Sequence, residues 1–568
     1  MAARPTHESH DARPIWQPIG VILLVALVAS VAGISNEFAQ DDIYLILQNA
    51  NAHSVANLGA IFRSPFWPAP FNPDLYRPLT SLWLAAQYQL GGGAPIVFRL
   101  VSYAMYAGVA VNVYLLARRF VPDAYALGAA LLFAAHPVHV EAVALGVGQS
   151  ELAVALIALI MVQRYLVRRA AGRLGLRDWI GLSLWYAVAS LFKEQGLMLP
   201  GLLIAAEWLL VDDREEGRIK SVVPGYVALA IVGTLVLAAR RAVLGDVAGT
   251  FVAEALVGVP FTGRLLTLLR VAVAWIRLFA WPAHLQADYG AQEVVASTSF
   301  GPIELAGMAI LLAITVSAWL MRRKCRAYAF GVVWCAIALF PVSNLLVPTA
   351  IVLAERTLFL PSVGFVLAVG GLLSLAAERF PQLVRPRGLA IACAILVVAG
   401  VARSIERQRV WRDDAFLAVR TVQDAPLSFR AQRIFGDVAF DLQRMEIATT
   451  AYDEALNLAP PAQRWRVRND IARTYRRAGQ TKIEAEHLRA SLADRPEQQD
   501  TRGYLISAEL SLGNYNDAAR QADTALVHGG DPAIFKGLRQ VADSAAKINA
   551  PAGSVRVRLT TGLVRRAQ

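Results

Sequence analysis

Two adjacent carboxylates, Asp41 and Asp42, are the first residues of this sequence that suggest chemistry. They follow an apolar segment at 17–35 and lie near the start of a loop at 36–96. Desolvation next to an apolar phase disfavours a charged carboxylate, so such a pair either is well solvated or has a function in the protein. The residues alone leave two interpretations open: a catalytic role, or an acidic turn at a membrane surface.

A second polar cluster contains His136, His139 and Glu141. Metal-binding histidines on a helix prefer a spacing of four residues, whereas these two are three apart with Pro137 between them. The spacing therefore disfavours a zinc site, and no metal is expected. We expect the cluster to form hydrogen bonds with a polar head group. A capped helix end at a membrane surface is the alternative.

Basic side chains stand where further apolar segments begin or end: Lys193, followed by Glu194, and Arg356. Cationic groups at the depth of lipid phosphates bind a phosphate through charge-assisted hydrogen bonds. The ordinary alternative is a snorkelling anchor, whose charged end reaches water beyond an apolar stem. The sequence thus predicts either a phosphate site or a set of membrane anchors.

The elements that must position these groups are apolar helices. Of 568 residues, 56% are hydrophobic and 17% charged, which excludes a single water-soluble enzyme. A bilayer core of about 30 Å requires about 20 apolar residues of a helix, and such runs recur through residues 1–402. The first run is expected to stay as an anchor and not to be cleaved as a signal peptide. We predict about eleven spans, at 17–35, 97–117, 124–142, 151–167, 178–192, 196–211, 222–239, 301–321, 327–347, 357–376 and 388–402.

Basic residues outside the spans predict the orientation, because Lys and Arg accumulate on the cytoplasmic side. With the N-terminus inside and eleven crossings, the first loop and all residues after 402 lie outside. The apolar segment 264–282 contains Arg264, Arg270 and Arg277, and we expect it to lie in the outer interface. The basic clusters that are then cytoplasmic are at 118–119, 164–177, 322–326 and 379–387.

The C-terminal part, residues 403–568, differs in composition. It carries 46 charged residues (Asp, Glu, Lys and Arg), about 28%, against 52, about 13%, in residues 1–402. A small residue, an aromatic residue and a closing proline recur with the spacing of a 34-residue tetratricopeptide (TPR) repeat. Such an α-solenoid has a concave face that holds a protein or a second copy of the chain, and it brings no chemistry. The residues are Gly436, Ala448, Tyr452, Ala455 and Pro460, with Ala518, Ala522 and Ala525 repeating three of them 70 residues later and Glu484 interrupting the middle copy.

The net charge of +12 is shared evenly between the two parts, with 29 basic against 23 acidic residues up to residue 402 and 26 against 20 beyond it. Neither part is basic enough to predict a nucleic-acid surface. The three cysteines, Cys325, Cys335 and Cys393, lie in or beside apolar segments and exclude a disulfide framework. Only six of the 55 basic residues are lysine and no Asn-x-Ser/Thr sequon occurs, which favours a bacterial source.

Taken together, these segments resemble the TMTC family, the transmembrane and tetratricopeptide-repeat-containing O-mannosyltransferases and their bacterial relatives. The resemblance covers almost the whole chain in the same order. Its motifs are Asp41-Asp42 with Asn49, Ser64-Pro-Phe-Trp67, Tyr76-Arg-Pro-Leu-Thr80, His136-Pro-Val-His139-Val-Glu-Ala-Val143, Phe192-Lys-Glu-Gln-Gly196 and Ala354-Glu-Arg-Thr-Leu-Phe-Leu-Pro361.

The resemblance implies an all-α, polytopic membrane bundle of GT-C type followed by the TPR α-solenoid. Such an enzyme transfers a sugar, mannose or a similar hexose, from a polyprenyl-phosphate donor to a hydroxyl of an acceptor outside the membrane, with inversion. In that superfamily an acidic residue of the first outer loop is the catalytic base, which here is Asp41 or Asp42. The donor and its phosphate would be bound, without a cofactor, by Arg77, His136, His139, Glu141, Lys193, Glu194 and Arg356.

Two departures from the family pattern bear on the identity of the sugar and the acceptor. Gln149-Ser-Glu151 stands where the animal proteins tend to have Arg-Ala-Asp, and Ala287-Asp-Tyr-Gly290 keeps part of an Asp-Trp-x-x-Gly-like motif. The acceptor is expected to be a protein Ser or Thr, with a glycan as the alternative. We expect a multi-pass protein of a bacterial inner membrane, with the active site and the repeats on the periplasmic side.

Two other classes of function are open at this point. One is a non-catalytic, membrane-anchored TPR scaffold for envelope or glycan assembly, for which the outer-loop acids would be dispensable. The other is a lipid or glycan transporter, which predicts polar and broken helices near the middle of the membrane. Most ionisable residues here cluster at the outer ends of the predicted spans, which favours an interfacial active site.

Overall fold

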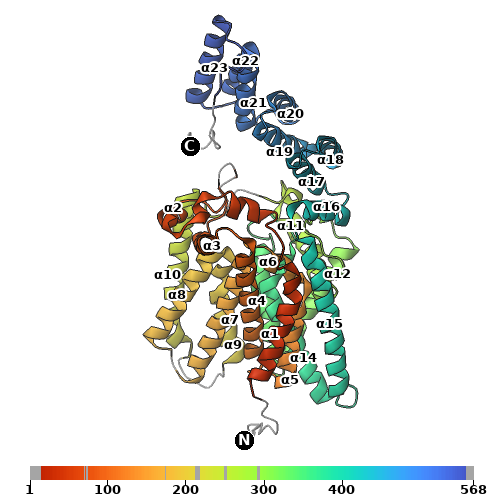
Figure 1. The fold of residues 1–568 in the computed structure, drawn as a ribbon. Coiled ribbons are helices and arrows are strands. Elements are labelled where there is room, and N and C mark those ends of the chain that lie inside the picture. Colours follow the sequence, from red (N-terminus) through yellow and green to blue (C-terminus); the bar gives the residue numbers. More distant parts are fainter. Residues whose placement is uncertain are drawn as a thin grey trace. The chain divides into compact units, whose positions relative to one another are not determined.

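The computed structural model describes residues 14–68, 71, 74–172, 174–211, 218–248, 252–290 and 294–557. Every regular element in these ranges is a helix (Figure 1). The chain forms two compact units that divide after Leu417. Residues 403–417, which follow the last predicted span, therefore pack with the membrane helices. The all-α class is confirmed for the described residues.

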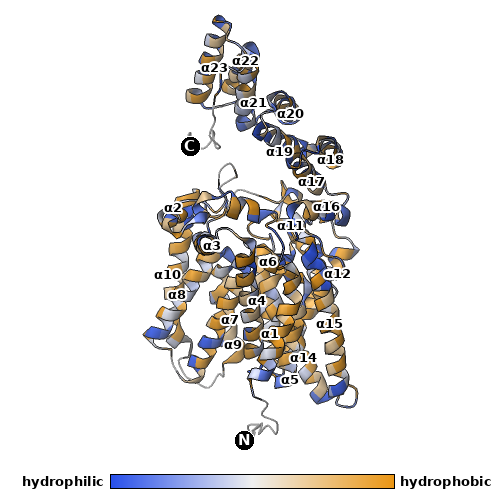
Figure 2. Cartoon of the chain, in the orientation of Figure 1, coloured by the Kyte–Doolittle hydropathy of each residue, from blue (hydrophilic) through white to orange (hydrophobic). Residues whose placement is uncertain are grey.

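The long helices of unit 1 form a bundle in which α4 packs against α1, α5 and α7, and α14 packs against α5 and α13. Figure 2 shows apolar residues along most of their length. These helices are α1 (Trp16–Ser30), α4 (Pro95–Ala117), α5 (Asp123–Ala135), α7 (Gln149–Ala170), α8 (Leu176–Phe192), α9 (Leu199–Leu210), α10 (Arg218–Leu244), α12 (Pro302–Met321), α13 (Arg326–Leu339), α14 (Phe359–Arg379) and α15 (Pro386–Val410).

The other helices of unit 1 connect those of the bundle, and many of them gather with the first loop at one end of the bundle (Figure 1). Most of them are short because prolines and polar residues end helical runs. They are η1 (Val31–Gly33), η2 (Ile43–Leu47), η3 (Ala50–His53), η4 (Val55–Asn57), α2 (Leu58–Arg63), α3 (Pro78–Gly91), η5 (Pro137–His139), α6 (Val140–Ala144), η6 (Glu194–Met198), η7 (Glu254–Leu256), α11 (Phe261–Ala280), η8 (Phe340–Val342) and η9 (Glu355–Leu358).

Within the described ranges, seven helices are long and apolar enough to cross a membrane: Trp16–Gly33, Pro95–Ala117, Gln149–Ala170, Ser221–Leu244, Pro302–Met321, Glu355–Arg379 and Pro386–Val410. The pair Asp123–Ala135 and Pro137–Ala144, bent by 48°, makes an eighth if it is one span. The three other predicted spans coincide with α8, α9 and α13, which have 17, 12 and 14 residues. Even 17 residues rise only about 25 Å, so the prediction of about eleven spans is not confirmed.

Helices α13 and α14 approach each other closely at two glycines. A Cβ atom on Gly331 would lie 2.4 Å from the carbonyl oxygen of Gly364, and the reverse distance is also 2.4 Å. Helices in membranes associate through such small residues, because lipid tails supply no hydrophobic driving force between helices. This contact fixes α14, whose N-terminal end carries the short helix η9 of the candidate site.

The amphipathic helix α11 is the segment that the sequence places in the outer interface. Its buried face includes Thr267, Val271 and Trp275, and its Arg270 Nε donates to Glu304 Oε1 of α12 at 2.9 Å. Within the described residues, α11 is not among the helices that suit a membrane span. Its interfacial position stays a prediction.

The helices of unit 2 pack in sequence, each against the next along the chain. The residues of the predicted repeat lie at these contacts: Ala448, Ala455, Ala518, Ala522 and Ala525 are fully buried, and a Cβ on Gly436 would lie 2.5 Å from the Tyr452 ring. The TPR solenoid itself stays a prediction. The helices are α17 (Phe429–Asp441), α18 (Met445–Leu458), η10 (Pro461–Gln463), α19 (Arg464–Arg477), α20 (Thr481–Asp494), α21 (Gln499–Leu512), α22 (Tyr515–Val527) and α23 (Pro532–Lys547), with α16 (Asp414–Asp424) joining the units along the chain.

Candidate functional site

The charged residues that the sequence singled out lie at one end of unit 1, where long helices begin or end. Asp41 and Asp42 precede η2, and Arg77 precedes α3. Helix termini leave backbone groups unpaired and end apolar runs, so polar side chains are accommodated there at lower free-energy cost than in mid-helix. The remaining members are Glu141 in α6, Lys193 and Glu194 between α8 and α9, and Arg356 in η9.

Asp42 is an anchor between two parts of the chain. Its side chain is fully buried, and its Oδ2 and Oδ1 accept hydrogen bonds from the backbone N–H groups of Gly146 at 2.7 Å and Val147 at 2.9 Å. Burial raises the pKa of Asp42 to about 6, although the Arg99 guanidinium and the two backbone N–H groups oppose the rise. Both carboxylate oxygens are therefore occupied, and Asp42 holds the first loop on the turn that precedes α7.

Asp41, by contrast, faces a cation. Its Oδ2 lies 3.3 Å from Nη1 of Arg356, and its side chain is 22% exposed. The same Nη1 lies 3.3 Å from Glu141 Oε1, while Glu141 Oε2 accepts the Arg356 backbone N–H at 2.8 Å. Glu141 thus fixes the main chain and the side chain of Arg356, and Arg356 bridges two carboxylates. The structure separates the two adjacent aspartates, which the sequence does not.

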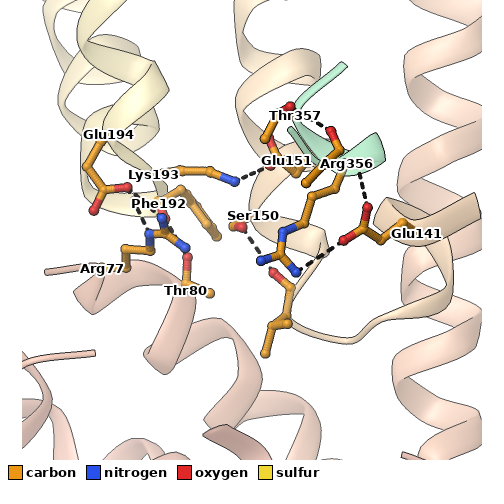
Figure 3. A network of polar contacts seen from close by, with 12 residues as sticks. Arg77, Thr80, Glu141, Ser150, Glu151, Phe192, Lys193, Glu194, Arg356 and Thr357 are labelled. Atoms are coloured by element: carbon orange, nitrogen blue, oxygen red, sulfur yellow. Dashed lines mark hydrogen bonds and ion pairs between the residues drawn. The ribbon is translucent and has the colours of Figure 1, made fainter. Parts of the chain in front are cut away.

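Lys193 forms an ion pair with Glu151, the third residue of α7 (Figure 3). Glu151 is almost completely buried, and Lys193 is the residue at which α8 ends. Burial lowers the pKa of Lys193, and Glu151 opposes that shift. Glu151 was not assigned a role from the sequence, although its position on the first turn of an apolar helix marks it as a carboxylate that needs a partner.

Glu194 holds two arginines together. Its Oε2 accepts from Arg77 Nε at 2.9 Å and Nη2 at 2.7 Å, and its Oε1 accepts from Arg240 Nη1 at 3.0 Å. Burial disfavours the charged carboxylate, but Arg77 and Arg240 outweigh it and lower the pKa of Glu194 to about 2. Arg240 is buried, and nothing in the sequence distinguished it from the other arginines near the end of α10.

Three pairs, each of a carboxylate and a cation, lie across this end of the bundle (Figure 3). The series runs from Glu194 and Arg77 through Lys193 and Glu151 to Arg356 and Glu141, and the side chains come from segments far apart in the sequence. Such an array holds cationic groups in fixed positions, where they are able to stabilise an anion that forms beside them. Asp41 supplies a partly exposed carboxylate at the Arg356 end.

The two histidines, which the sequence assigns to a head group, form hydrogen bonds within the protein. His139 is 1% exposed, its Nδ1 lies 3.1 Å from Tyr106 Oη, and its Nε2 lies 2.8 Å from Ser362 Oγ. His136 Nε2 lies 3.0 Å from the carbonyl oxygen of Phe279, and its Nδ1 accepts the Val138 N–H at 3.3 Å. All four ring nitrogens have protein partners, because the bend after α5 turns both rings towards neighbouring helices. A role of either histidine in binding the donor stays a prediction.

Gln149 is also occupied within the protein. Its Oε1 accepts from Trp83 Nε1 at 2.7 Å and Gln87 Nε2 at 2.8 Å, and its Nε2 donates to Gln87 Oε1, the Phe98 carbonyl oxygen and Ser102 Oγ. The side chain is completely buried. This departure from the family motif therefore joins α7 to α3 and α4 and does not face the charged array.

The chemistry of the donor set does not indicate a metal centre. Among the described residues, no group of three or more His, Cys, Asp or Glu side chains has a geometry that would hold a metal ion. The carboxylates of the array are instead paired with arginine and lysine side chains.

Comparisons with known proteins agree with these features. Residues 73–239 match the family model for dolichyl-phosphate-mannose-protein mannosyltransferases. The chain is 27% identical over 481 residues to protein O-mannosyl-transferase TMTC4 of Mus musculus, covering 74% of this chain and 64% of the relative. It is 27% identical over 383 residues to TMTC3 of the same species (61% and 41%) and 22% identical over 452 residues to F38B6.6 of Caenorhabditis elegans (78% and 62%). The chain thus spans about two fifths to two thirds of the length of these relatives.

The helical bundle with its apolar, span-length helices supports a membrane protein. The matches support the TMTC family and the GT-C superfamily, to which the motifs of the first loop, the α8–α9 junction and η9 had pointed.

Proposed function

We propose that the protein is a membrane glycosyltransferase that transfers mannose or a similar hexose from a polyprenyl-phosphate donor to a hydroxyl of an acceptor, with inversion of configuration. The observation that carries the proposal is the pairing of Asp41, a partly exposed carboxylate, with Arg356 in a row of fixed cations. The names of the relatives, protein O-mannosyl-transferases, support mannose as the sugar and a protein as the acceptor. A Ser or Thr side chain supplies the acceptor hydroxyl.

Asp41 is the proposed general base. The acceptor oxygen attacks the anomeric carbon from the face opposite the phosphate, and its proton passes to the Asp41 carboxylate. A new carbon–oxygen bond forms as the bond from the anomeric carbon to the phosphate oxygen breaks. Polyprenyl phosphate leaves with that electron pair. Asp42 does not take the proton, because both of its oxygens accept backbone hydrogen bonds inside the protein.

Arg356, Lys193 and Arg77 are the groups that stabilise the departing phosphate. Each is held by a carboxylate, so its position is set before the donor arrives, and preorganised charges stabilise a developing anion without reorganisation. Glu141 and Glu194 act on the donor through the arginines they hold. A donor phosphate competes with these carboxylates for the same N–H groups.

The wider architecture is part of the same proposal. Residues 1–402 form the membrane domain with eleven crossings, which requires that α8, α9 and α13 each cross although they are short. Of residues 403–568, the part from 418 onward, which belongs to unit 2, forms a TPR domain on the periplasmic side of a bacterial inner membrane. The sequential helix packing of unit 2 and the burial of its repeat residues support a solenoid that docks the acceptor protein.

The test is sugar transfer by the full chain reconstituted in lipid vesicles, with polyprenyl-phosphate-mannose as the donor and envelope proteins from cells that lack this chain as the acceptors. Mass spectrometry identifies modified peptides, and the initial rate is measured for Asp41→Asn, Asp42→Asn and Glu378→Gln. Glu378, an exposed carboxylate at the opposite end of α14 from η9, is the matched control.

We expect Asp41→Asn to lower the rate about 10²- to 10⁴-fold, the usual contribution of general base catalysis. Asp42→Asn should lower it less, because it removes no proton acceptor from the site, and Glu378→Gln should match the wild type. Full activity of Asp41→Asn would refute the assignment of the base. If the wild-type chain transfers no sugar but its host still requires the C-terminal repeats, the TPR scaffold is the correct function.

A further inference from the structure

A stretch after the last predicted span, residues 403–414, touches both sides of the site. We call it the junction segment; it comprises the end of α15 and the start of α16, and it belongs to unit 1. The sequence assigns it to the soluble tail. We propose that the junction segment positions Asp41 and Arg356 opposite each other, with Arg407 as its principal positioning residue. The inference rests on the proposed function, because it concerns the two residues that the mechanism uses.

The first contact is on the Arg356 side. Arg407, 1% exposed, pairs through Nη2 with Oε1 of Glu355 at 3.3 Å, and Glu355 is completely buried. The same Oε1 accepts the Gln286 backbone N–H at 2.6 Å and the Tyr289 hydroxyl at 3.1 Å. Glu355 is the residue before Arg356 in η9, so its buried carboxylate fixes the turn from which the Arg356 guanidinium extends.

The second contact is on the Asp41 side. The Gln408 carbonyl oxygen accepts from Asn36 Nδ2 at 2.8 Å, the Arg412 carbonyl oxygen accepts the Glu37 N–H at 2.8 Å, and Asp414 Oδ1 accepts the Gln40 N–H at 2.9 Å. These bonds hold the residues that lead directly into Asp41.

Gln40 shows that the position of Asp41 is imposed by its surroundings. Its φ is +54°, in the left-handed region that side chains other than glycine rarely adopt. Such a conformation persists where neighbouring contacts over-determine it, and the hydrogen bond to Asp414 is one of these contacts. The next residue is the proposed base.

Because the junction segment contacts the residues beside both Asp41 and Arg356, it affects the relative position of these two groups. Asp41 and Arg356 are 315 residues apart in the sequence, yet their Oδ2 and Nη1 atoms lie 3.3 Å apart. Helix η9 and residues 36–40 each contact the junction segment. If either of them is displaced, Asp41 moves relative to Arg356. Misplacement of a catalytic group by about 1 Å is enough to lower a rate about 100-fold.

The experiment measures kcat and KM for polyprenyl-phosphate-mannose with the full chain in vesicles, for Arg407→Gln, Arg407→Lys and Asp414→Ala. Arg409→Gln is the matched control, because Arg409 lies on the same helical turn and is exposed. The double variant Glu355→Gln, Arg407→Gln removes both buried charges together. We expect it to fold even where the lone buried Glu355 carboxylate destabilises the single variant.

We expect Arg407→Gln and Asp414→Ala to lower kcat about 10- to 100-fold, the range typical of residues that orient a site through another residue. KM should change less, Arg407→Lys should recover part of the rate, and Arg409→Gln should match the wild type. Wild-type kcat in folded Asp414→Ala and in the double variant would overturn the inference. Loss of activity in Asp41→Asn beside full activity in these variants would refute the positioning role and leave the proposed function intact.

Discussion

Glu194 offers a direct measure of how firmly the charged array is held. Its carboxylate accepts three hydrogen bonds from Arg77 and Arg240, and the substitution Glu194→Gln leaves one oxygen for two guanidinium groups. Whichever way the amide turns, its NH₂ group faces an arginine donor. The variant therefore loses charge-assisted hydrogen bonds and brings two cations together without a counter-charge.

The size of the effect follows from the pKa of this carboxyl group. The fall of the Glu194 pKa from the ordinary 4.5 to about 2 corresponds to roughly 3 kcal/mol in favour of the charged form in the folded protein. The Glu194 side chain is 29% exposed, so solvent screening reduces this figure. We expect Glu194→Gln to lower the free energy of unfolding by about 2 to 3 kcal/mol at pH 7.

The contribution of Glu194 to the free energy of unfolding depends on pH, and the sign of this dependence is defined. The pKa of Glu194 is lower in the folded protein than in the unfolded chain, so its stabilising contribution is complete above about pH 4.5. It is lost as the pH falls from 4.5 towards 2. The difference in stability between the wild type and Glu194→Gln should therefore narrow as the pH falls through this range.

The assay is thermal unfolding of the purified full chain in detergent micelles, followed by tryptophan fluorescence from pH 7 to pH 3. Glu378→Gln, which removes an exposed carboxylate from α14, is the control and should unfold like the wild type at each pH. Equal stability of Glu194→Gln and wild type at pH 7 would refute the reasoning. A stability difference that does not narrow at low pH would show that the charge of Glu194 is not its source.

Two further perturbations test the packing around Asp42. A Cβ at position 148 would lie 2.3 Å from the Ala142 carbonyl oxygen, so Gly148→Ala should destabilise the protein by about 1 to 3 kcal/mol. The control is Gly181→Ala, whose Cβ has nothing within 4 Å, and it should be neutral or stabilising by up to about 1 kcal/mol. Equal melting temperatures for the two variants would contradict this prediction. Because the pKa of Asp42 is raised from 3.8 to about 6, its contribution to stability is complete below about pH 4 and is lost as the pH rises through 6. Wild type should lose roughly 3 kcal/mol relative to Asp42→Asn over that range, and parallel stability curves for the two proteins would exclude this effect.

Much of the fold is determined by local properties of the sequence. Apolar runs of about 20 residues predict helices because a backbone in an apolar phase must satisfy its hydrogen bonds within the segment. All eleven predicted spans coincide with helices, but length and composition identify seven or eight of them as membrane-crossing within the described residues. The shortfall arises at α8, α9 and α13, which have only 17, 12 and 14 residues.

The motifs are equally local, and they indicated a candidate site without distinguishing the roles of its residues. The Asp41-Asp42 pair, Lys193 with Glu194, and Arg356 were recognised from residue type and position beside apolar segments. Which aspartate is anchored depends on the turn at Gly146 and Val147, more than 100 residues away. Asp41 and Asp42 are identical residues with the same sequence neighbourhood, so only a contact with a distant part of the chain distinguishes their roles.

The tertiary structure alone assigned the partners of the buried charges. His139 forms hydrogen bonds with Tyr106 and Ser362. Arg240 forms an ion pair with Glu194, and Arg407 forms one with Glu355. Hydropathy and periodicity record how each helix is buried, and they carry no information on which polar groups meet where helices cross. A buried charge is stable only with its partner in place, so that choice is made by the packing of the whole bundle.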